Sequence, residues 1–330
     1  MVRFLALTVA MLALGAGVVA CGDDDDGGGG SSGGGAASDE APKQLRGAIV
    51  PTATHLPIMV AEDEGIFERN GIDMTLTTVQ NLATLPGAMG RQFDFGSSTI
   101  PDVIKANQQG IEITLTSGVS IEESDNVTIG LLARKGSGIE TAKDLEGKKV
   151  AVVTLGGNIH TATLFWLQNE GVDTEKIDFI EVPPPNHLDQ MKSGDVDAVE
   201  TLEPFRGAVL ATGATQLVDP ILEVIDPGAT LSWMSARSFA DENPDTVAAV
   251  RKSLDEGMQF IEDDEPRARE ILAKYSGLPP EVANAVPLPS YSTELPLDEV
   301  AAWADMLSAI GQLEGSPEDV DPAQIIASGS

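Results

Sequence analysis

The chain has 330 residues, of which 20 are lysine or arginine and 52 are aspartate or glutamate, so its formal net charge is −32. This balance argues against nucleic acid as a partner, because neutralising phosphates requires clustered basic residues. An acidic, solvated surface that keeps the protein soluble is the simpler interpretation.

An apolar run from Phe4 to Ala20 precedes Cys21, the only cysteine of the chain, and Arg3 lies ahead of it. The run is shorter than the about 20 apolar residues that cross a membrane as a helix. We therefore expect residues 1–20 to be a removable signal peptide. Cys21 would then be acylated, with palmitate, and anchor the protein to the extracytoplasmic face of the cell membrane. An uncleaved membrane anchor is the alternative.

Residues 21–43 are mostly Asp, Gly, Ser and Ala, which predicts a flexible tether after the lipidated cysteine. The remaining chain is longer than one ordinary core of roughly 100 to 200 residues, so two lobes are expected.

From Leu45 onward, short β-branched runs alternate with amphipathic stretches. This pattern predicts an α/β fold in which helices cover mostly parallel sheets. Strands are expected in the first lobe at 45–50, 72–79, 93–96 and 111–117. Helices are expected between them at 54–69, 82–91 and 100–109.

The same alternation continues in a second lobe. Strands are expected there at 127–133, 149–154, 177–182 and 198–201. Helices are expected at 158–170, 188–193 and 204–211. A strand at 230–235 then rejoins the first lobe, which is covered by helices at 244–263, 265–275, 279–286 and 297–310. The last residues, rich in Asp, Pro and Ser, are expected to form a loose surface tail.

This organisation assigns residues 44–126 and 222–330 to lobe 1 and residues 127–221 to lobe 2. The hinge is expected near Asn126 and Val127 and around 222–228.

Four segments carry a family resemblance, and they occur in order at 56–73, 90–96, 135–152 and 191–205. The third contains Asp144-Leu145-Glu146-Gly147, and the fourth ends in Glu203-Pro204-Phe205. Together they resemble the sulfonate, nitrate and taurine-binding proteins of ABC importers, in the family that also holds thiamine-pyrimidine-precursor binders. The resemblance implies a periplasmic-binding-protein fold of type II, whose two lobes are joined by two crossing strands. It also implies an ABC permease and its ATPase as partners.

Ligands of open α/β sheets bind beyond the carboxyl ends of the strands. This rule selects the polar residues that follow three of the predicted strands. They are Thr52, Thr54, His55, Ser97, Ser98, Thr99, Gly157, Asn158, His160 and Thr161. Each set opens a predicted helix, whose free N–H groups and dipole favour an anionic group. Simple helix capping is the alternative for Ser98, Thr99 and Asn158.

His55 lies in Thr54-His55-Leu56-Pro57, which resembles the Asn-His-x-Pro stretch of the thiamine-pyrimidine-precursor binders, with Thr54 in place of Asn. A neutral imidazole there could hydrogen-bond to a heteroaromatic ring or stack on it. A structural histidine with a local partner is the alternative.

Three further residues are candidates near the predicted cleft. Glu200 and Glu203 would favour an amine or a ring N–H over a bare anion such as nitrate, unless Arg206 neutralises Glu203 in an i,i+3 pair. Trp233 could form an aromatic wall of the site or belong to the core.

No metal site and no cofactor are expected, because the three histidines lack metal-ligand spacing and no second cysteine is present. The resemblance therefore predicts a monomeric solute-binding lipoprotein of an ABC importer, without catalysis. Its ligand would be a sulfonate, a taurine-like compound or a thiamine pyrimidine precursor. The alternative is an enzyme similar to the pyrimidine-precursor synthases on the same fold. The sequence argues against this alternative, because such synthases are expected to carry a cysteine-rich motif and this chain has only one cysteine.

Overall fold

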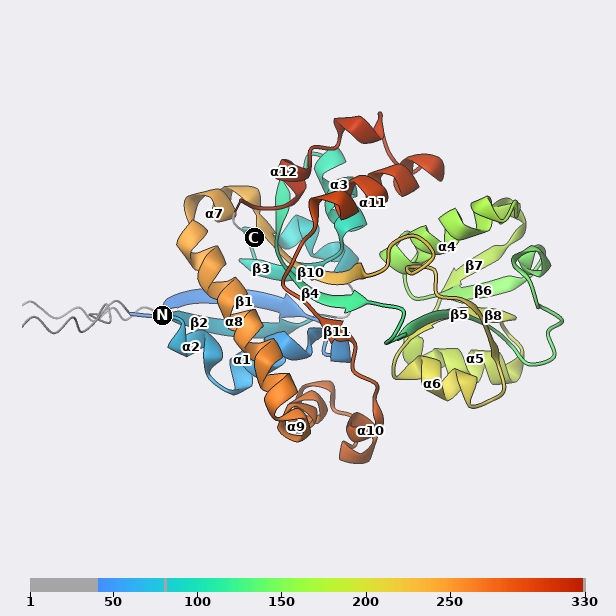
Figure 1. The fold of residues 1–330 in the computed structure, drawn as a ribbon, viewed down its shortest axis with the longest axis horizontal. Coiled ribbons are helices and arrows are strands. Elements are labelled where there is room, and N and C mark those ends of the chain that lie inside the picture. Colours follow the sequence, from blue (N-terminus) through green and yellow to red (C-terminus); the bar gives the residue numbers. More distant parts are fainter. Residues whose placement is uncertain (1–40, 80–81, 329–330) are drawn as a thin grey trace, which may run out of the picture. The chain divides into compact units, whose positions relative to one another are not determined.

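The computed structural model describes residues 41–79 and 82–328. Residues Ala41–Ser330 form one compact unit, and this unit holds a six-stranded and a five-stranded sheet (Figure 1). The predicted signal peptide and the lipidation site Cys21 lie outside the described residues. No helix in the described ranges combines the length and hydropathy that a membrane crossing needs.

The six-stranded sheet has the strand order β11-β4-β10-β3-β1-β2. Its strands are β1 (Lys43–Ile49), β2 (Ile72–Thr78), β3 (Phe95–Ser98), β4 (Ile113–Glu122), β10 (Gly228–Ala236) and β11 (Ser290–Tyr291). β1 is parallel to β2 and β3, whereas β10 is antiparallel to β3 and β4. The returning strand β10 thus enters the centre of the sheet in the opposite direction, and the sheet is mixed rather than mostly parallel.

Helices cover both faces of this sheet. On one face lie α1 (Leu56–Asp63), α2 (Ile66–Arg69), α7 (Arg237–Glu242), α8 (Pro244–Asp263) and α9 (Glu265–Ser276). On the other face lie α3 (Ile100–Gln108), α11 (Leu297–Ala309) and α12 (Pro322–Ile325). The strands feed both cores because their side chains alternate: Leu45 and Ile49 are buried on the first face and Ala48 on the second. The short helix α10 (Pro280–Ala285) follows α9.

The five-stranded sheet has the order β7-β6-β8-β5-β9 and is also mixed. Its strands are β5 (Ile129–Ala133), β6 (Lys149–Val152), β7 (Asp178–Glu181), β8 (Ala198–Leu202) and β9 (Thr215–Val218). Helix α4 (Asn158–Asn169) covers one face, and α5 (His187–Ser193) and α6 (Phe205–Leu210) cover the other. Short 3-10 turns complete the chain: η1 (Ala53–His55), η2 (Leu82–Thr84), η3 (Pro86–Ala88), η4 (Ala142–Leu145), η5 (Thr174–Lys176), η6 (Pro184–Asn186) and η7 (Pro317–Asp319).

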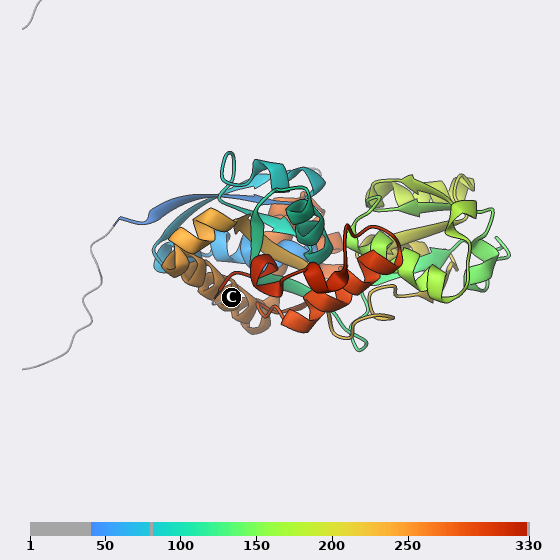
Figure 2. The same cartoon turned by 90° about the horizontal axis from the view of Figure 1, so that it is seen from above.

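The chain passes between the two sheets twice. The first crossing, residues 123–128, leads from β4 to β5, and the second crossing, residues 219–227, leads from β9 to β10. Helix α4 also packs against the six-stranded sheet's own helices, because Ile159 and Ala162 share a hydrophobic core with Val300 and Trp303 of α11. Both views show α4 beside α11 (Figures 1 and 2). The lobe boundaries stay a prediction.

Three predicted segments differ from the structure. The predicted helix 82–91 is only the two turns η2 and η3, because Pro86 lacks a backbone donor and Gly90 has a positive φ of 71°. The predicted helix 54–69 is interrupted at Gly65, where φ is 65°. The loose tail was a wrong prediction: Ile325 and Ile326 are buried, and the N–H of Ala327 donates to the carbonyl of Leu115 in β4 at 2.8 Å.

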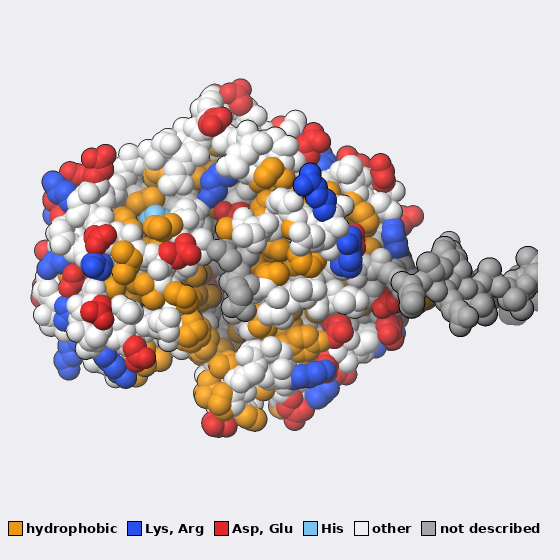
Figure 3. Space-filling model, turned by 180° about the vertical axis from the view of Figure 1, so that it is seen from behind, with side chains coloured by type: hydrophobic (Ala, Val, Ile, Leu, Met, Phe, Trp, Pro, Cys, Tyr) orange, Lys and Arg blue, Asp and Glu red, His pale blue; other side chains and the backbone are white. Residues whose placement is uncertain are grey.

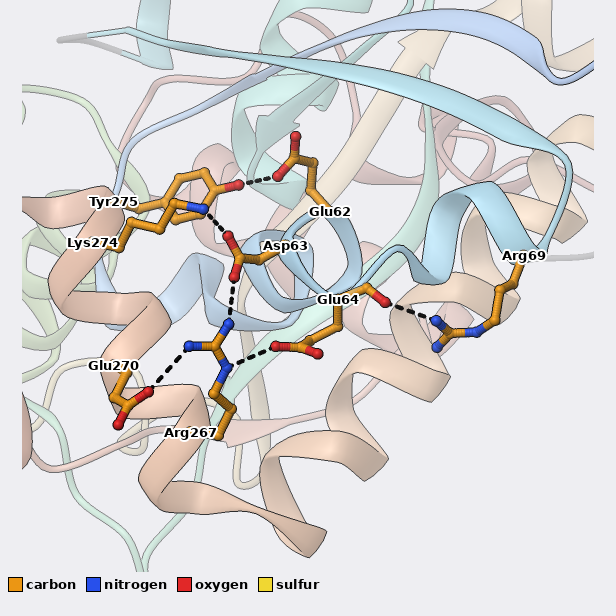
Figure 4. A network of polar contacts seen from close by, with 8 residues as sticks. All are labelled: Glu62, Asp63, Glu64, Arg69, Arg267, Glu270, Lys274 and Tyr275. Atoms are coloured by element: carbon orange, nitrogen blue, oxygen red, sulfur yellow. Dashed lines mark hydrogen bonds and ion pairs between the residues drawn. The ribbon is translucent and has the colours of Figure 1, made fainter.

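Polar contacts fasten α1 to α9 at one end of the first core (Figure 4). The carboxylate of Asp63 accepts from Nη2 of Arg267 at 2.9 Å, and Glu64 accepts from Nε of Arg267 at 2.8 Å. The hydroxyl of Tyr275 donates to the carboxylate of Glu62. The Asp63 side chain is only 5% exposed, so water screens this ion pair less than it screens a typical surface pair.

Gly257 allows α8 to lie directly on α1, and replacing it by alanine tests this contact. A Cβ at this position would lie 2.5 Å from the backbone oxygen of Pro57. We expect Gly257→Ala to lower the free energy of unfolding by about 1–3 kcal/mol in urea denaturation, although alanine is the better helix former by about 1 kcal/mol. The control is Gln259→Ala at an exposed position of the same helix, which should be near neutral. An unchanged or raised stability of Gly257→Ala would contradict this packing.

Candidate functional site

Most candidate residues lie where strands of both sheets give way to helices. Thr52, Thr54 and His55 follow β1, whereas Ser97 and Ser98 are the last residues of β3 and Thr99 directly precedes α3. The start of α4 contains Asn158, His160 and Thr161, and Gly157 directly precedes it. Glu200 lies in β8, Glu203 directly follows β8, and Trp233 lies in β10. The surface is hollowed between the parts of the unit that hold the two sheets, and hydrophobic side chains gather along this hollow (Figure 3).

A series of contacts connects the start of α4 to the turn after β1. Nδ2 of Asn158 donates to the carbonyl of Thr230 at 3.1 Å, and the hydroxyl of Thr230 lies 2.9 Å from that of Ser120. Tyr291, the register partner of Ser120, donates its hydroxyl to the carbonyl of Ala53 at 2.9 Å. Segments of both sheets therefore meet at the candidate site.

His55 is 2% exposed, and hydroxyl groups surround one edge of its ring. Its Nδ1 lies 2.9 Å from the Thr52 hydroxyl and 3.1 Å from the Thr54 hydroxyl, while Nε2 has no partner in the described part of the chain. Burial lowers the pKa of His55 to about 3, so its imidazole is neutral at physiological pH. The structure thus brings together the three predicted residues Thr52, Thr54 and His55. The buried Nε2 of His55 has no hydrogen-bond partner in the described residues.

The helices that begin at these residues lack side-chain caps. Thr99 precedes α3, but its hydroxyl donates to the carboxylate of Asp102 at 2.7 Å instead of capping the backbone. Gly157 precedes α4 and has no side chain to cap it. By contrast, Asp264 caps α9 by accepting from the N–H of Arg267. The first N–H groups of α3 and α4 therefore remain available to another acceptor.

His160 is a buried residue in the first turn of α4. Its Nδ1 accepts from the N–H of Gly156 at 2.9 Å, and its ring meets Phe179 edge-on at 4.8 Å between centroids. Burial, followed by the charge of Lys105, lowers the pKa of His160 to about 4. Lys105 also donates to the carbonyl of Gly156, which ties α3 to the turn before α4.

The acidic candidates occupy two different environments. Glu200 is fully buried beside Thr163 of α4, and burial raises the pKa of Glu200 to about 8. Glu203 pairs with Nη1 of Arg206 at 3.1 Å and accepts from the N–H of Gly207 at 3.1 Å. Arg206 therefore neutralises Glu203 in this structure, in the i,i+3 pair that the sequence offered as the alternative to a ligand contact.

Trp233 lies in the core of the six-stranded sheet. Its indole is 0% exposed and stacks on Phe95 with 5.5 Å between ring centroids and on Phe67 with 6.2 Å. In this structure it packs as a core tryptophan, the second of the two sequence interpretations.

Sequence reasoning did not select Lys105, Thr230 or Tyr291, which connect the candidate site across the two sheets. Their partners lie 51, 72 and 238 positions away in the chain, and no local motif marks such distant contacts. In the described ranges, no cluster of three His, Cys, Asp or Glu side chains is placed to hold a metal ion.

The chain is similar to a known protein family and to several named proteins. The family described as NMT1/THI5 like matches residues 52–268. A Bacillus subtilis protein named as an aliphatic sulfonates-binding protein is 24% identical over 237 residues, which is 70% of this chain and 69% of that protein. A 4-amino-5-hydroxymethyl-2-methylpyrimidine phosphate synthase of Schizosaccharomyces pombe is 30% identical over 109 residues, 33% of this chain and 30% of the synthase. These matches confirm the resemblance that the four segments indicated.

The fold matches a solved structure. The periplasmic aliphatic sulphonate binding protein SsuA from Escherichia coli aligns with a TM-score of 0.71 at 21% identity, over 87% of this chain and 98% of that chain. The predicted two-lobed periplasmic-binding-protein fold is therefore confirmed.

The buried carboxyl group of Glu200 makes a prediction about pH. Because its pKa is raised on folding, the folded state keeps the proton to higher pH than the unfolded state, and stability is lost as the pH rises from about 4.5 to about 8. Glu200→Gln removes this loss, so its stability relative to the parent protein should increase by a few kcal/mol across that range. Chemical denaturation at several pH values measures the difference.

The exposed residue Glu170, at the end of α4, supplies the matched control. We expect the stability of Glu200→Gln relative to the parent to vary with pH more than that of Glu170→Gln, because only the Glu200 carboxyl group is buried. Equal pH dependence of the two variants would show that burial does not raise the pKa of Glu200.

Proposed function

The chain belongs to the NMT1/THI5-like family, and we propose that it is the solute-binding component of an ABC importer, facing away from the cytoplasm. It captures a small organic ligand between its two lobes and delivers that ligand to a membrane permease and its ATPase. The protein works as a monomer and carries out no catalysis. Relatives named for aliphatic sulfonate binding, matched over most of this chain, support the proposal.

One observation supports this function most directly. Helices α3 and α4 follow strands of different sheets, begin without side-chain caps, and are tied together where Lys105 of α3 donates to the carbonyl of Gly156. A ligand that accepts hydrogen bonds from both helix starts would hold the two lobes together. Binding then selects the closed arrangement, which is how a two-lobed receptor reports its loaded state to a partner.

The charges around the site favour a ligand recognised by neutral donors. Arg206 is already paired with Glu203, and Lys105 contacts both Asp102 and the carbonyl of Gly156. Hydroxyl groups, a neutral imidazole and helix N–H groups remain. These suit a sulfonate, a taurine-like compound or the heteroaromatic ring of a thiamine pyrimidine precursor better than a bare inorganic anion.

We assign ligand contacts to the polar groups at the starts of α1, α3 and α4, with the open Nε2 of His55 as the central one. The acids at β8 are retained as residues whose contact depends on lobe closure, whereas Trp233, packed in the core of the six-stranded sheet, is assigned no ligand contact. The assigned set is Thr52, Thr54, His55, Ser97, Ser98, Thr99, Gly157, Asn158, His160, Thr161, Glu200 and Glu203.

The apolar run before Cys21 supports a lipid-anchored location. We propose that residues 1–20 are removed and that lipid on Cys21 holds the protein at the extracytoplasmic face of the cell membrane. The acidic, glycine-rich tether then lets the binding unit reach the permease.

A second candidate function is a pyrimidine-precursor synthase. The observation that favours it is the match to the Schizosaccharomyces pombe synthase, although that match covers only 33% of this chain. Product formation, measured by mass spectrometry in the binding experiment below, distinguishes the two functions.

Thermal unfolding with a panel of ligands tests the transport function. Sulfonates, taurine, nitrate, aromatic carboxylates and thiamine pyrimidine precursors are added to the purified protein. A ligand that binds only the folded state raises the unfolding midpoint by mass action, and at 100 times its Kd it adds about 2.7 kcal/mol. We expect a clear rise for one chemical class without any product. Product formation without a rise in the midpoint would favour the synthase.

Replacing His55 by alanine tests the assigned site. We expect His55→Ala to weaken binding of the ligand found in the panel by at least about tenfold in titration calorimetry, because a hydrogen bond from the open Nε2 is lost. The matched control is His187→Ala, since His187 is also fully buried but bonds the carbonyl of Val182 within lobe 2 at 2.8 Å. Equal affinities of the two variants would place the ligand elsewhere.

A further inference from the structure

Two buried carboxyl groups lie at the points where the chain leaves one sheet for the other. Glu122 is the last residue of β4, directly before the first crossing, and it is 0% exposed. Asp219 is the first residue of the second crossing, directly after β9, and it is 8% exposed. One buried acid thus stands where each crossing leaves its sheet.

Glu122 is bound by the chain that starts the five-stranded sheet. Its carboxylate accepts from the backbone N–H and the hydroxyl of Thr128 and, at 3.0 Å, from the N–H of Ile129. These three donors tie the end of β4 to the beginning of β5. All three groups donate, so both oxygens of the Glu122 side chain act as acceptors.

Asp219 lacks such donors on one of its oxygens. Oδ1 accepts from the N–H groups of Ile221 at 3.0 Å and Leu222 at 3.3 Å, while Oδ2 has no donor in the described residues. Asp219 directly follows Val218, which pairs with Leu131 of β5, so Asp219 lies close to the start of β5, where the N–H of Ile129 donates to Glu122. Burial, followed by the nearby Glu122, raises the pKa of Asp219 to about 8. Oδ2 of Asp219 is buried, accepts no hydrogen bond in the described residues and lies near another carboxyl group. A protonated Asp219 would carry its hydrogen on this oxygen.

No cation compensates this pair within residues 41–79 and 82–328: neither acid forms an ion pair with lysine or arginine. Four other acids on the adjoining elements have donors. They are Glu123 with the hydroxyl of Ser290, Asp226 with the N–H of Ser124, Glu203 with Arg206, and Glu299 with the N–H of Ala229. Asp125 and Glu223, on the crossings themselves, are exposed to water, and Glu200 of β8 is buried without a hydrogen-bond partner in the described residues. Loss of the proton would therefore leave two uncompensated negative charges in one buried place.

We propose that Glu122 and Asp219 share one proton and form a pH-sensitive lock that sets the angle between the two lobes. With the proton in place, the acid of the second crossing donates to the carboxylate of the first and holds the crossings together. Without it, the two carboxylates repel each other and the crossings separate. Because the five-stranded sheet is covalently attached only through these crossings, their separation rotates the whole lobe. This regulation acts through the hinge and does not depend on the identity of the ligand.

Distance measurement between the lobes tests the lock without any ligand. Nitroxide labels are placed on Lys192→Cys and Glu281→Cys, two exposed positions, in the full chain with Cys21→Ser. Pulsed electron resonance then gives the distance distribution at about pH 6 and about pH 9, on either side of the transition. We expect the mean distance to shift between the two pH values. An unchanged distribution would overturn the proposal, even if the proposed transport function is correct.

Asp219→Asn identifies the group responsible. Its side-chain oxygen still accepts from the backbone and its amide donates to Glu122 at every pH, so the distance should stay at the pH 6 value. If this variant does not fold, Glu122→Gln serves instead, because its amide can donate to Asp219. The control Glu299→Gln changes another buried acid, whose pKa burial raises to about 7, and should keep the parent's shift. A pH shift in Asp219→Asn equal to the parent's would also overturn the lock.

Discussion

Everything that the two halves of this molecule do together depends on their being joined by only two short segments of chain. The register pairs Glu122 with Gly228, so the end of β4 lies beside the start of β10, and the first crossing leaves the sheet next to the point where the second enters it. A joint of this kind allows rotation but little sliding. The hydrophobic contact of α4 with α11 then limits how far the rotation can go, because opening would expose Ile159 and Trp303 to water.

The same joint brings the candidate polar residues of the two sheets close to one another. Candidate polar residues follow β1, β3 and β6, and α3 and α4 start after β3 and β6 without side-chain caps. Asp264 caps α9, Asp321 caps α12 and Thr141 caps η4, whereas the other long helices α8 and α11 also begin without a side-chain cap. Leaving a cap out costs about 1 kcal/mol at each helix start, and a ligand that accepts the free N–H groups restores that loss on binding.

The sequence predicted those elements whose pattern is local. Helix α8 was predicted with its observed bounds, because Pro244 opens it and Val247, Val250, Leu254 and Ile261 recur at helical spacing. The pairing of β11 and the docking of Ile326 on β4 were missed, since both depend on contacts with strands far away in the chain. At the candidate site, the turn around His55 was found from the strand-to-helix rule. The contacts of Lys105 and Asn158, which join the two sheets, have no sequence pattern.

The position of β10 in the middle of the six-stranded sheet has a consequence for the order of folding. The five-stranded sheet has all its strands once Val218 has emerged, whereas the six-stranded sheet still lacks its central strand until Ala236 is available. During synthesis or translocation from the amino terminus, the inserted half can therefore complete its core while β1 to β4 still expose theirs. The six-stranded half, which contains the first strands of the chain, is therefore the half that completes its sheet last.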